Sequence, residues 1–292
     1  MTLNNFNTRW SMMFVLIVLL TAGCSVAPLH RHLDPSLTNN TYDVVVLSKI
    51  PKEEIHVPVQ EKQYTSPGGG LLWIMVDKGI NKARASSAEK TIAPLLEATA
   101  DVDFRTQYWN QLEPLLYESP WMKITRFDKR SLGYNKEEIT NIKAPILILT
   151  TFYQLSPNFQ ALVVQTKANL YLIDTSKPDY FGFMSYYSDK IGKNNEKNEK
   201  AVELWAADNA AAYRKTLAEG IEQNMKMLRL DLIDGPANPQ NEQGEELKLN
   251  IMSPITGSSE TLQGKVLDRK NSRIVIRDKG GNLFSVDTNS KK

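Results

Sequence analysis

Few residues of this chain could carry out catalysis. There is one cysteine, Cys24, and the three histidines, His30, His32 and His56, all lie within the first 56 residues. A serine or cysteine nucleophile needs histidine or an equivalent base beside it. The sequence also lacks the G-x-S-x-G, P-loop, G-x-G-x-x-G and H-E-x-x-H motifs. The pattern therefore predicts no nucleophilic catalysis and no cofactor.

The histidines do not make a convincing metal site. His30 and His32 are two residues apart, a spacing that shares a metal ion only on a strand or a loop. A structural zinc ion needs four ligands, and neither a third nor a fourth can be identified nearby. We therefore predict no bound metal.

Two pairs of carboxylates could in principle hydrolyse a glycan, since glycosidases use two acidic side chains. The pairs are Asp101/Asp103 and Glu137/Glu138. A simpler interpretation makes Asp101 a helix N-cap and the glutamates part of a solvated helical turn. We assign no catalytic residue and predict that the protein is not an enzyme. A carboxylate-dependent cell-wall (peptidoglycan) hydrolase remains an alternative.

A short apolar run precedes the cysteine. Residues 12–20 are nine consecutive apolar residues, with Arg9 before them and Thr21, Ala22 and Gly23 after them. As a helix the run is about 14 Å long, whereas a bilayer core is about 30 Å thick. A basic start, a short apolar stretch and small residues are typical of a secretory signal peptide.

The stretch Leu20-Thr21-Ala22-Gly23-Cys24 resembles the lipobox of bacterial lipoproteins, with Thr21 where leucine is commonest. The resemblance covers about the first 24 residues. It implies diacylglyceryl attachment to the Cys24 sulfur, cleavage before Cys24, and acylation of the new amino terminus, for example by palmitate. Two or three acyl chains anchor a protein stably, whereas one binds only marginally. Ser25 is not the aspartate that retains such proteins in the inner membrane. This favours the periplasmic face of the outer membrane in a Gram-negative cell.

Composition is ordinary for a globular protein. Removal of residues 1–23 from the 292-residue chain leaves 269 residues, 41% of the whole chain is apolar, and the formal net charge is +2. Such a balance gives no electrostatic reason to expect nucleic-acid binding. The lipid on Cys24 is the only predicted membrane contact, because no second apolar run is long enough to span a bilayer.

Hydrophobic periodicity predicts an α/β fold of the α+β type, with a mainly antiparallel sheet covered by helices and a small C-terminal all-β unit. The expected parts are a tether over 24–40, a main domain over 41–233, a linker over 234–247 and the β unit over 248–292. Expected strands are 42–47, 121–127, 145–153, 159–174, 180–187, 261–267, 273–277 and 283–287. Expected helices are 71–85, a segment around 86–98, 102–117, 135–142 and 201–230.

Aromatic residues gather on the strand 180–187. If alternation places apolar groups on both of its faces, the strand is either buried on both sides or has one face that recognises a protein, a glycan or a lipid. The residues of this possible partner surface are Tyr180, Phe181, Phe183, Tyr186 and Tyr187.

These observations predict a membrane-anchored envelope lipoprotein with a non-enzymatic binding or scaffolding role in the periplasm. It would be held by lipid on Cys24 and have an envelope protein as partner. Besides the hydrolase, a second alternative is a carrier of a lipid or other apolar ligand between sheet and helix. The sequence specifies neither the partner nor the ligand.

Overall fold

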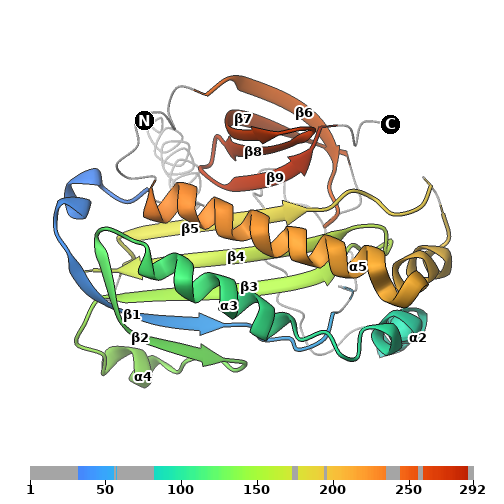
Figure 1. The fold of residues 1–292 in the computed structure, drawn as a ribbon, viewed down its shortest axis with the longest axis horizontal. Helices are drawn as coiled ribbons and strands as arrows, with labels where there is room; N and C mark the ends of the chain where they lie inside the picture. Colours follow the sequence, from blue (N-terminus) through green and yellow to red (C-terminus); the bar gives the residue numbers. More distant parts are fainter. Residues whose placement is uncertain are drawn as a thin grey trace, which may run out of the picture.

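The fold is built on one large mixed sheet with helices packed against it (Figure 1). Within the described residues the sheet has nine strands, in the order β2-β1-β3-β4-β5-β9-β8-β7-β6. Most neighbouring strands are antiparallel, so the prediction of an α/β fold with a mainly antiparallel sheet is confirmed. The computed structural model describes residues 32–55, 57, 82–172, 177–193, 196–234, 244–255 and 259–288.

Two parallel pairings in the first half were not predicted. β1 pairs in parallel with both β2 and β3. Parallel neighbours require a long crossover, and the segment from β1 to β2 supplies it with helices α2 and α3. The strands of this half are β1 (Tyr42–Lys49), β2 (Met122–Arg130), β3 (Ile146–Leu155), β4 (Leu162–Tyr171) and β5 (Tyr180–Tyr187).

Strand β4 shows why the sheet has one helix-covered face. Its residues Leu162, Val164 and Leu170 are fully buried, whereas Lys167 and Asn169 on the opposite face are partly exposed. This alternation is the period of two that the sequence shows.

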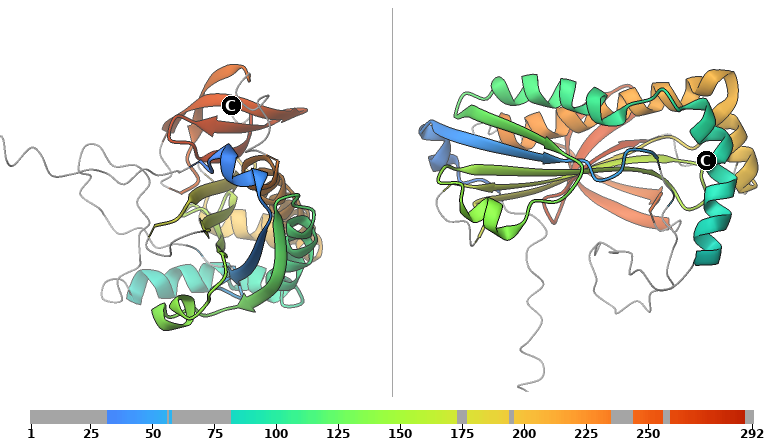
Figure 2. Two further views of the ribbon diagram at one scale, coloured as in Figure 1. Left: turned by 90° about the vertical axis from the view of Figure 1, so that its left-hand side faces the viewer. Right: turned by 90° about the horizontal axis from the view of Figure 1, so that it is seen from below.

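Three helices, α2 (Lys82–Ala98), α3 (Phe104–Tyr117) and α5 (Asn198–Leu228), pack together, and α3 and α5 lie on the same face of the sheet (Figure 2). The short helix α4 (Lys136–Thr140) lies on the other face, beside the apolar cluster of Val45, Leu47 and Ile146.

A buried polar network fixes α3 and α5 on the sheet. The Tyr108 hydroxyl of α3 donates to Asn224 Oδ1 of α5 at 2.6 Å and lies 2.7 Å from Thr166 Oγ1 of β4. Thr151 of β3 lies 2.8 Å from the same Thr166 oxygen. Burial raises the pKa of Tyr108 to about 12, so the hydroxyl keeps its proton and remains a donor.

Helix α5 has the expected position but is kinked. Ala207 is extended, and Asp208, Asn209 and Ala210 have φ between 52° and 57°. Left-handed conformations cost L-residues roughly 1–2 kcal/mol each. The apolar spacing of the sequence predicts that Ala207 faces the core of a regular helix. In the kinked helix Ala207 is exposed, whereas Trp205 and Ala210 are buried.

The C-terminal strands continue the main sheet. β9 pairs in parallel with β5 through Met184↔Leu283 to Tyr186↔Ser285. β6 was not predicted, and it begins inside the predicted linker 234–247, whose Gly, Pro, Asn and acidic residues are typical of a loop. The C-terminal strands are β6 (Glu246–Met252), β7 (Ser259–Lys270), β8 (Arg273–Asp278) and β9 (Leu283–Asp287), and they follow the π-helical turn η2 (Arg229–Ile233).

The predicted tether is shorter than expected. Leu33 is buried in the main core, and Leu37 packs against that core. Between them begins the 3-10 helix η1 (Pro35–Asn39), with Asp34 as its N-cap. The apolar side chains of this segment are the reason that it lies against the domain rather than acting as a free spacer.

Most of the predicted helix 71–85 lies outside the described residues, and its last positions belong to α2. The N-cap of α3 is Asp103, not Asp101: its carboxylate accepts from the Thr106 backbone N–H at 2.9 Å.

A buried carboxylate joins the two halves of the sheet. Asp231, in η2, accepts from the Tyr180 hydroxyl of β5 at 2.6 Å and from Arg277 Nη2 of β8 at 2.7 Å. The Tyr180 ring lies over Gly182, where a Cβ atom would be 2.0 Å from the tyrosine oxygen and 3.0 Å from Asp231 Oδ2. Glycine is therefore required at position 182.

We predict that Gly182→Ala lowers the free energy of unfolding by about 1–3 kcal/mol, the usual cost of overpacking a filled site. The measurement is urea unfolding. Gly133→Ala is the matched control, because its added methyl would meet only the flexible end of Lys49, at 3.2 Å. Equal stability of the two variants would contradict the assigned contact.

Candidate functional site

The candidate functional site is a cleft at the end of the sheet where β1 finishes. Its volume is about 260 Å³. The segment after β1, the turn between α2 and α3, β3, and α5 just beyond its kink all contribute to it. The lining residues are Glu53, Glu54, Ile55, Leu96, Thr99, Ala100, Asp101, Val102, Asp103, Tyr153 and Tyr213.

Arg214 connects the kink of α5 to the wall of this cleft. Its Nη1 and Nη2 donate to the two oxygens of Asp101 at 3.0 and 2.6 Å. Its Nε donates to the Asn209 carbonyl at 2.9 Å, and Nη2 also reaches the Ala98 carbonyl at 3.0 Å. One side chain thus joins the left-handed segment of α5, the end of α2 and a carboxylate of the cleft.

The two aspartates are held in the ionised form. The hydrogen bonds from Arg214 lower the pKa of Asp101. The hydrogen bonds from the Thr106 side chain and backbone lower the pKa of Asp103. A general acid needs a raised pKa to hold its proton near neutrality, and these two aspartates have the opposite.

Contacts with Phe104 and with the loop after β1 hold Tyr153 in the cleft wall. Tyr153 stacks on Phe104 with the ring centroids 3.9 Å apart, and its hydroxyl donates to the Glu53 carbonyl. Arg105 fixes the same loop through Glu53 Oε2 at 3.2 Å and the Ile50 carbonyl at 3.1 Å. Burial raises the pKa of both Tyr153 and Tyr213, so neither can serve as a base at neutral pH.

This arrangement suits binding better than acid–base chemistry. It offers carboxylate oxygens and aromatic edges to a cationic or hydrogen-bonding group.

The second predicted carboxylate pair, Glu137/Glu138, lies in α4 and not in this cleft. Glu138 closes a capping box with Asn135 and pairs with Arg130 at 2.9 Å, and Glu137 lies in the same first turn of α4.

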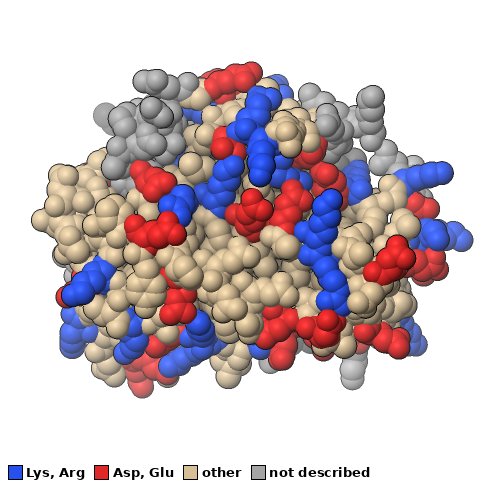
Figure 3. Space-filling view, in the orientation of Figure 1, with Lys and Arg blue, Asp and Glu red and all other residues tan. Residues whose placement is uncertain are grey.

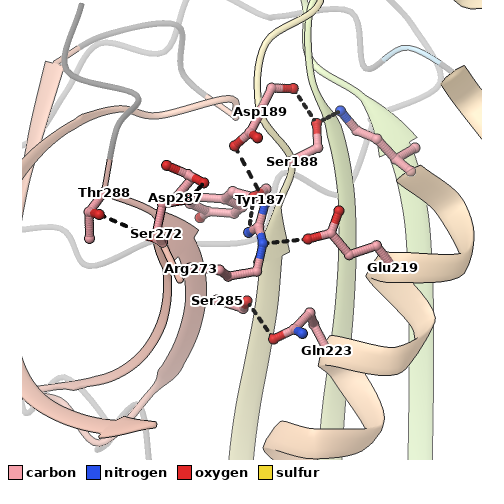
Figure 4. A network of polar contacts seen from close by, with 11 residues as sticks. Tyr187, Ser188, Asp189, Glu219, Gln223, Ser272, Arg273, Ser285, Asp287 and Thr288 are labelled. Carbon is pink, nitrogen blue, oxygen red and sulfur yellow. Dashed lines mark hydrogen bonds and ion pairs between the residues drawn. The ribbon is translucent and has the colours of Figure 1, made fainter. Parts of the chain in front are cut away.

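A second polar centre lies where the C-terminal strands meet α5 and β5 (Figure 4). Arg273 of β8 donates to the Tyr187 carbonyl at 3.0 Å, pairs with Glu219 of α5 at 2.5 Å, and lies 3.4 Å from Asp189. Its guanidinium is 4.8 Å from the centroid of the Tyr186 ring. Arg273 is therefore a structural link between β8, β5 and α5.

The helix α5 presents a polar row to these strands. Besides Glu219, Gln223 accepts from the Ser285 hydroxyl at 3.0 Å, and Lys226 pairs with Asp268. A cavity of about 40 Å³ lies nearby, lined in part by Asp189 and Asp287. Burial raises the pKa of Asp189 against the opposing effect of Arg273. The cavity volume is of the order needed for one or a few water molecules.

The aromatic strand is mostly interior. Tyr180 and Tyr186 belong to the main core under α5, and Tyr187 packs with the C-terminal strands against Phe284. Phe183 is buried as well, and Phe181 alone of the five is partly exposed, with Lys167 Nζ 5.0 Å from its ring. Four of the five proposed partner residues are therefore covered by the chain itself.

The remaining sequence candidates lie largely outside the described residues. This is the case for Cys24, His30 and His56, whereas His32 is described and exposed. The described residues contain no group of three or more potential metal ligands. Among the described helices, none is long and apolar enough to cross a membrane.

Sequence reasoning missed the arginines that organise both polar centres. Arg214 and Arg273 stand in ordinary surface-like contexts, and their partners lie up to 116 residues away in the chain. No local pattern marks such a residue.

Comparison with protein-family models and with curated proteins finds no match for the chain.

We predict that Arg214→Gln raises the pKa of Asp101 toward its ordinary value while leaving that of Asp103 unchanged. Because the pKa of Asp101 is lower in the folded than in the unfolded protein, its ionised form stabilises the fold at pH values above the unfolded-state pKa. This stabilisation is lost as the pH falls through the folded-state pKa. The variant should therefore be less stable than the wild type near neutrality, and the difference should shrink in acid.

Carboxyl NMR titration measures both aspartates in one experiment. Asp103 is the internal control, because its hydrogen bonds come from Thr106 and not from Arg214. An unshifted Asp101 would show that the ion pair does not form in solution.

Proposed function

We propose that this protein is a lipid-anchored binding or scaffolding protein of the bacterial envelope, held by Cys24. The observation that carries the proposal is the sequence Leu20-Thr21-Ala22-Gly23-Cys24 after a short apolar run, with no other thiol in the chain. A lone cysteine cannot form an intramolecular disulfide. Lipidation would give Cys24 an anchoring role, and the preceding residues Leu20-Thr21-Ala22-Gly23 resemble the lipobox that directs this modification. The periplasmic face of the outer membrane is the proposed location in a Gram-negative cell.

The placement of the domain supports this proposal. Seven residues lie between Cys24 and His32, where the described structure begins, so eight residue steps join the two positions. That length of chain spans at most about 29 Å. The folded domain would therefore stay close to the membrane, with its first strand starting at Tyr42. The cleft is at the far end of this strand and would point into the periplasm.

The electrostatics of the cleft favour a binding role over an enzymatic one. Asp101 and Asp103 both have lowered pKa values, whereas a glycosidase needs one carboxyl whose pKa is raised.

We also propose a finer division of the fold. In it α3 and α5 cover one face of a main domain and α2 packs against α5. Strands β6–β9 form a small unit whose apolar cluster also includes Val163 and Tyr187 of the main domain.

The carrier alternative gains no support from the packing under α5. Leu217 and Ile221 are buried there. At Gly220 a Cβ atom would lie 2.9 Å from Val164 and 3.0 Å from Tyr186. Helix and sheet are thus in direct contact at the place where an apolar ligand was considered.

We predict that Cys24→Ser abolishes lipid labelling and moves the protein from the membrane fraction to the soluble periplasmic fraction. The measurement is metabolic labelling with a radioactive fatty acid, followed by cell fractionation. Ser25→Asp is the matched control: it keeps the lipid but shifts the protein to the inner membrane in a Gram-negative host. Continued labelling of Cys24→Ser would refute the anchor.

A separate test addresses the hydrolase alternative. Purified protein incubated with peptidoglycan should release no soluble fragments, and Asp101→Asn together with Asp103→Asn should leave this result unchanged. Release by the wild type that the double variant abolishes would instead establish an enzyme. Glu137→Gln with Glu138→Gln is the control for the second pair, whose members lie in α4.

A further inference from the structure

We propose that one end of the domain, formed by η1 and the C-terminus of α3, lies against the bilayer that holds Cys24. This inference rests on the proposed lipid anchor and adds an orientation to it. The surface is defined by Pro35–Thr41 together with Tyr117 and Pro120, and it is called the η1 end below.

The chain enters the domain at the η1 end. Leu33 is buried, so the path from the anchor is fixed to the domain one residue after His32. The 3-10 helix η1 follows, and then β1 begins beside the start of β2, with Tyr42 N–H donating to the Trp121 carbonyl at 3.0 Å. The α3 C-terminus precedes that start of β2 directly, so all three segments meet at the same end (Figure 1).

The η1 end carries little charge. From Pro35 to Thr41 there is no ionisable side chain, and Pro35, Asn39 and Thr41 are exposed. Figure 3 shows this as a largely tan surface at the left, where η1 lies in Figure 1. An uncharged surface can approach lipid head groups without the cost of removing water from charged side chains.

Most of the charges at its border form ion pairs. Arg229 binds Glu118 next to Tyr117, and Lys123 lies 3.7 Å from Asp43 next to Tyr42. Asp34, the N-cap of η1, adds one exposed carboxylate, which accepts a hydrogen bond from the Ser36 N–H at 2.9 Å. The border therefore carries a small negative charge and does not depend on an anionic membrane.

Tyr117 is the feature that points to a lipid interface. Its side chain is 57% exposed at the end of α3. Tyrosine is enriched at the boundary between lipid and water, where its ring meets apolar groups and its hydroxyl stays hydrated. Among the described residues one other large hydrophobic side chain is exposed, Leu132 at 77%.

Leu132 supplies a control within the same molecule. It follows β2, whose start pairs with Tyr42 and whose end pairs with Lys49. Eight residues of strand are about 26 Å long, so Leu132 lies at the opposite end of this strand pair from Tyr117. A bilayer at the η1 end would contact position 117 and leave position 132 in water.

The test uses the full-length lipidated protein in vesicles of phosphatidylethanolamine and phosphatidylglycerol. Tyr117→Cys and Leu132→Cys each introduce a single reactive thiol, because the lipid blocks the sulfur of Cys24. A nitroxide is attached, and its collisions with oxygen and with a water-soluble nickel complex are measured by electron paramagnetic resonance. We expect the oxygen-to-nickel ratio at position 117 to be several-fold higher than at position 132.

Equal ratios at the two positions, in protein that floats with the vesicles, would overturn the orientation and leave the anchor intact. Protein that does not float, and in which Cys24 also takes the label, would overturn both. Asn39→Cys gives a second probe on η1 in case the substitution at 117 impairs folding. It should behave as position 117 does.

Discussion

The structure depends on a carboxylate that water does not reach. The Asp231 side chain is 2% exposed, and an isolated charge there would be very costly. Tyr180 and Arg277 supply its hydrogen bonds, and each comes from a different strand. Three distant segments must therefore be in place together: β5, the π-helical turn after α5, and β8. Loss of one partner from such a buried pair typically costs about 3–5 kcal/mol. The nine strands of the described residues form one continuous sheet, because β5 and β9 pair directly and β8 pairs with β9.

Much of the architecture could be predicted from hydrophobic periodicity. The long alternation in β4 and the aromatic run of β5 predicted two strands of the sheet, and the apolar spacing predicted α3 and α5. Hydrophobic periodicity gave a wrong prediction where the backbone is irregular but the sequence contains no residue typical of a helix break. The kink at Ala207–Ala210 contains neither glycine nor proline, so a regular helix placed Ala207 inside, whereas it is exposed. Strand β6 was partly hidden in a segment whose composition is typical of a linker.

The candidate site was less predictable than the fold. Asp101 and Asp103 attracted attention as a pair and as a helix cap, and the structure brings both to one cleft. Different partners lower their pKa values. Asp103 accepts hydrogen bonds from Thr106, three residues later, whereas Asp101 accepts them from Arg214, more than a hundred residues later. Only the folded chain brings Arg214 to Asp101, so sequence spacing could not show how the pKa of Asp101 is set. The aromatic strand shows the converse: its side chains could serve recognition, but the C-terminal strands and α5 cover most of them.

The central claim is that a folded domain is held to a membrane by its first mature residue, with the cleft directed away from the lipid. Mass spectrometry of the amino-terminal peptide from membrane-extracted protein tests this claim most directly. The account predicts a chain that begins at Cys24 and carries a diacylglyceryl group on sulfur and an acyl group on the amino nitrogen. A mature chain that begins at another residue, or a free thiol at Cys24, would contradict it.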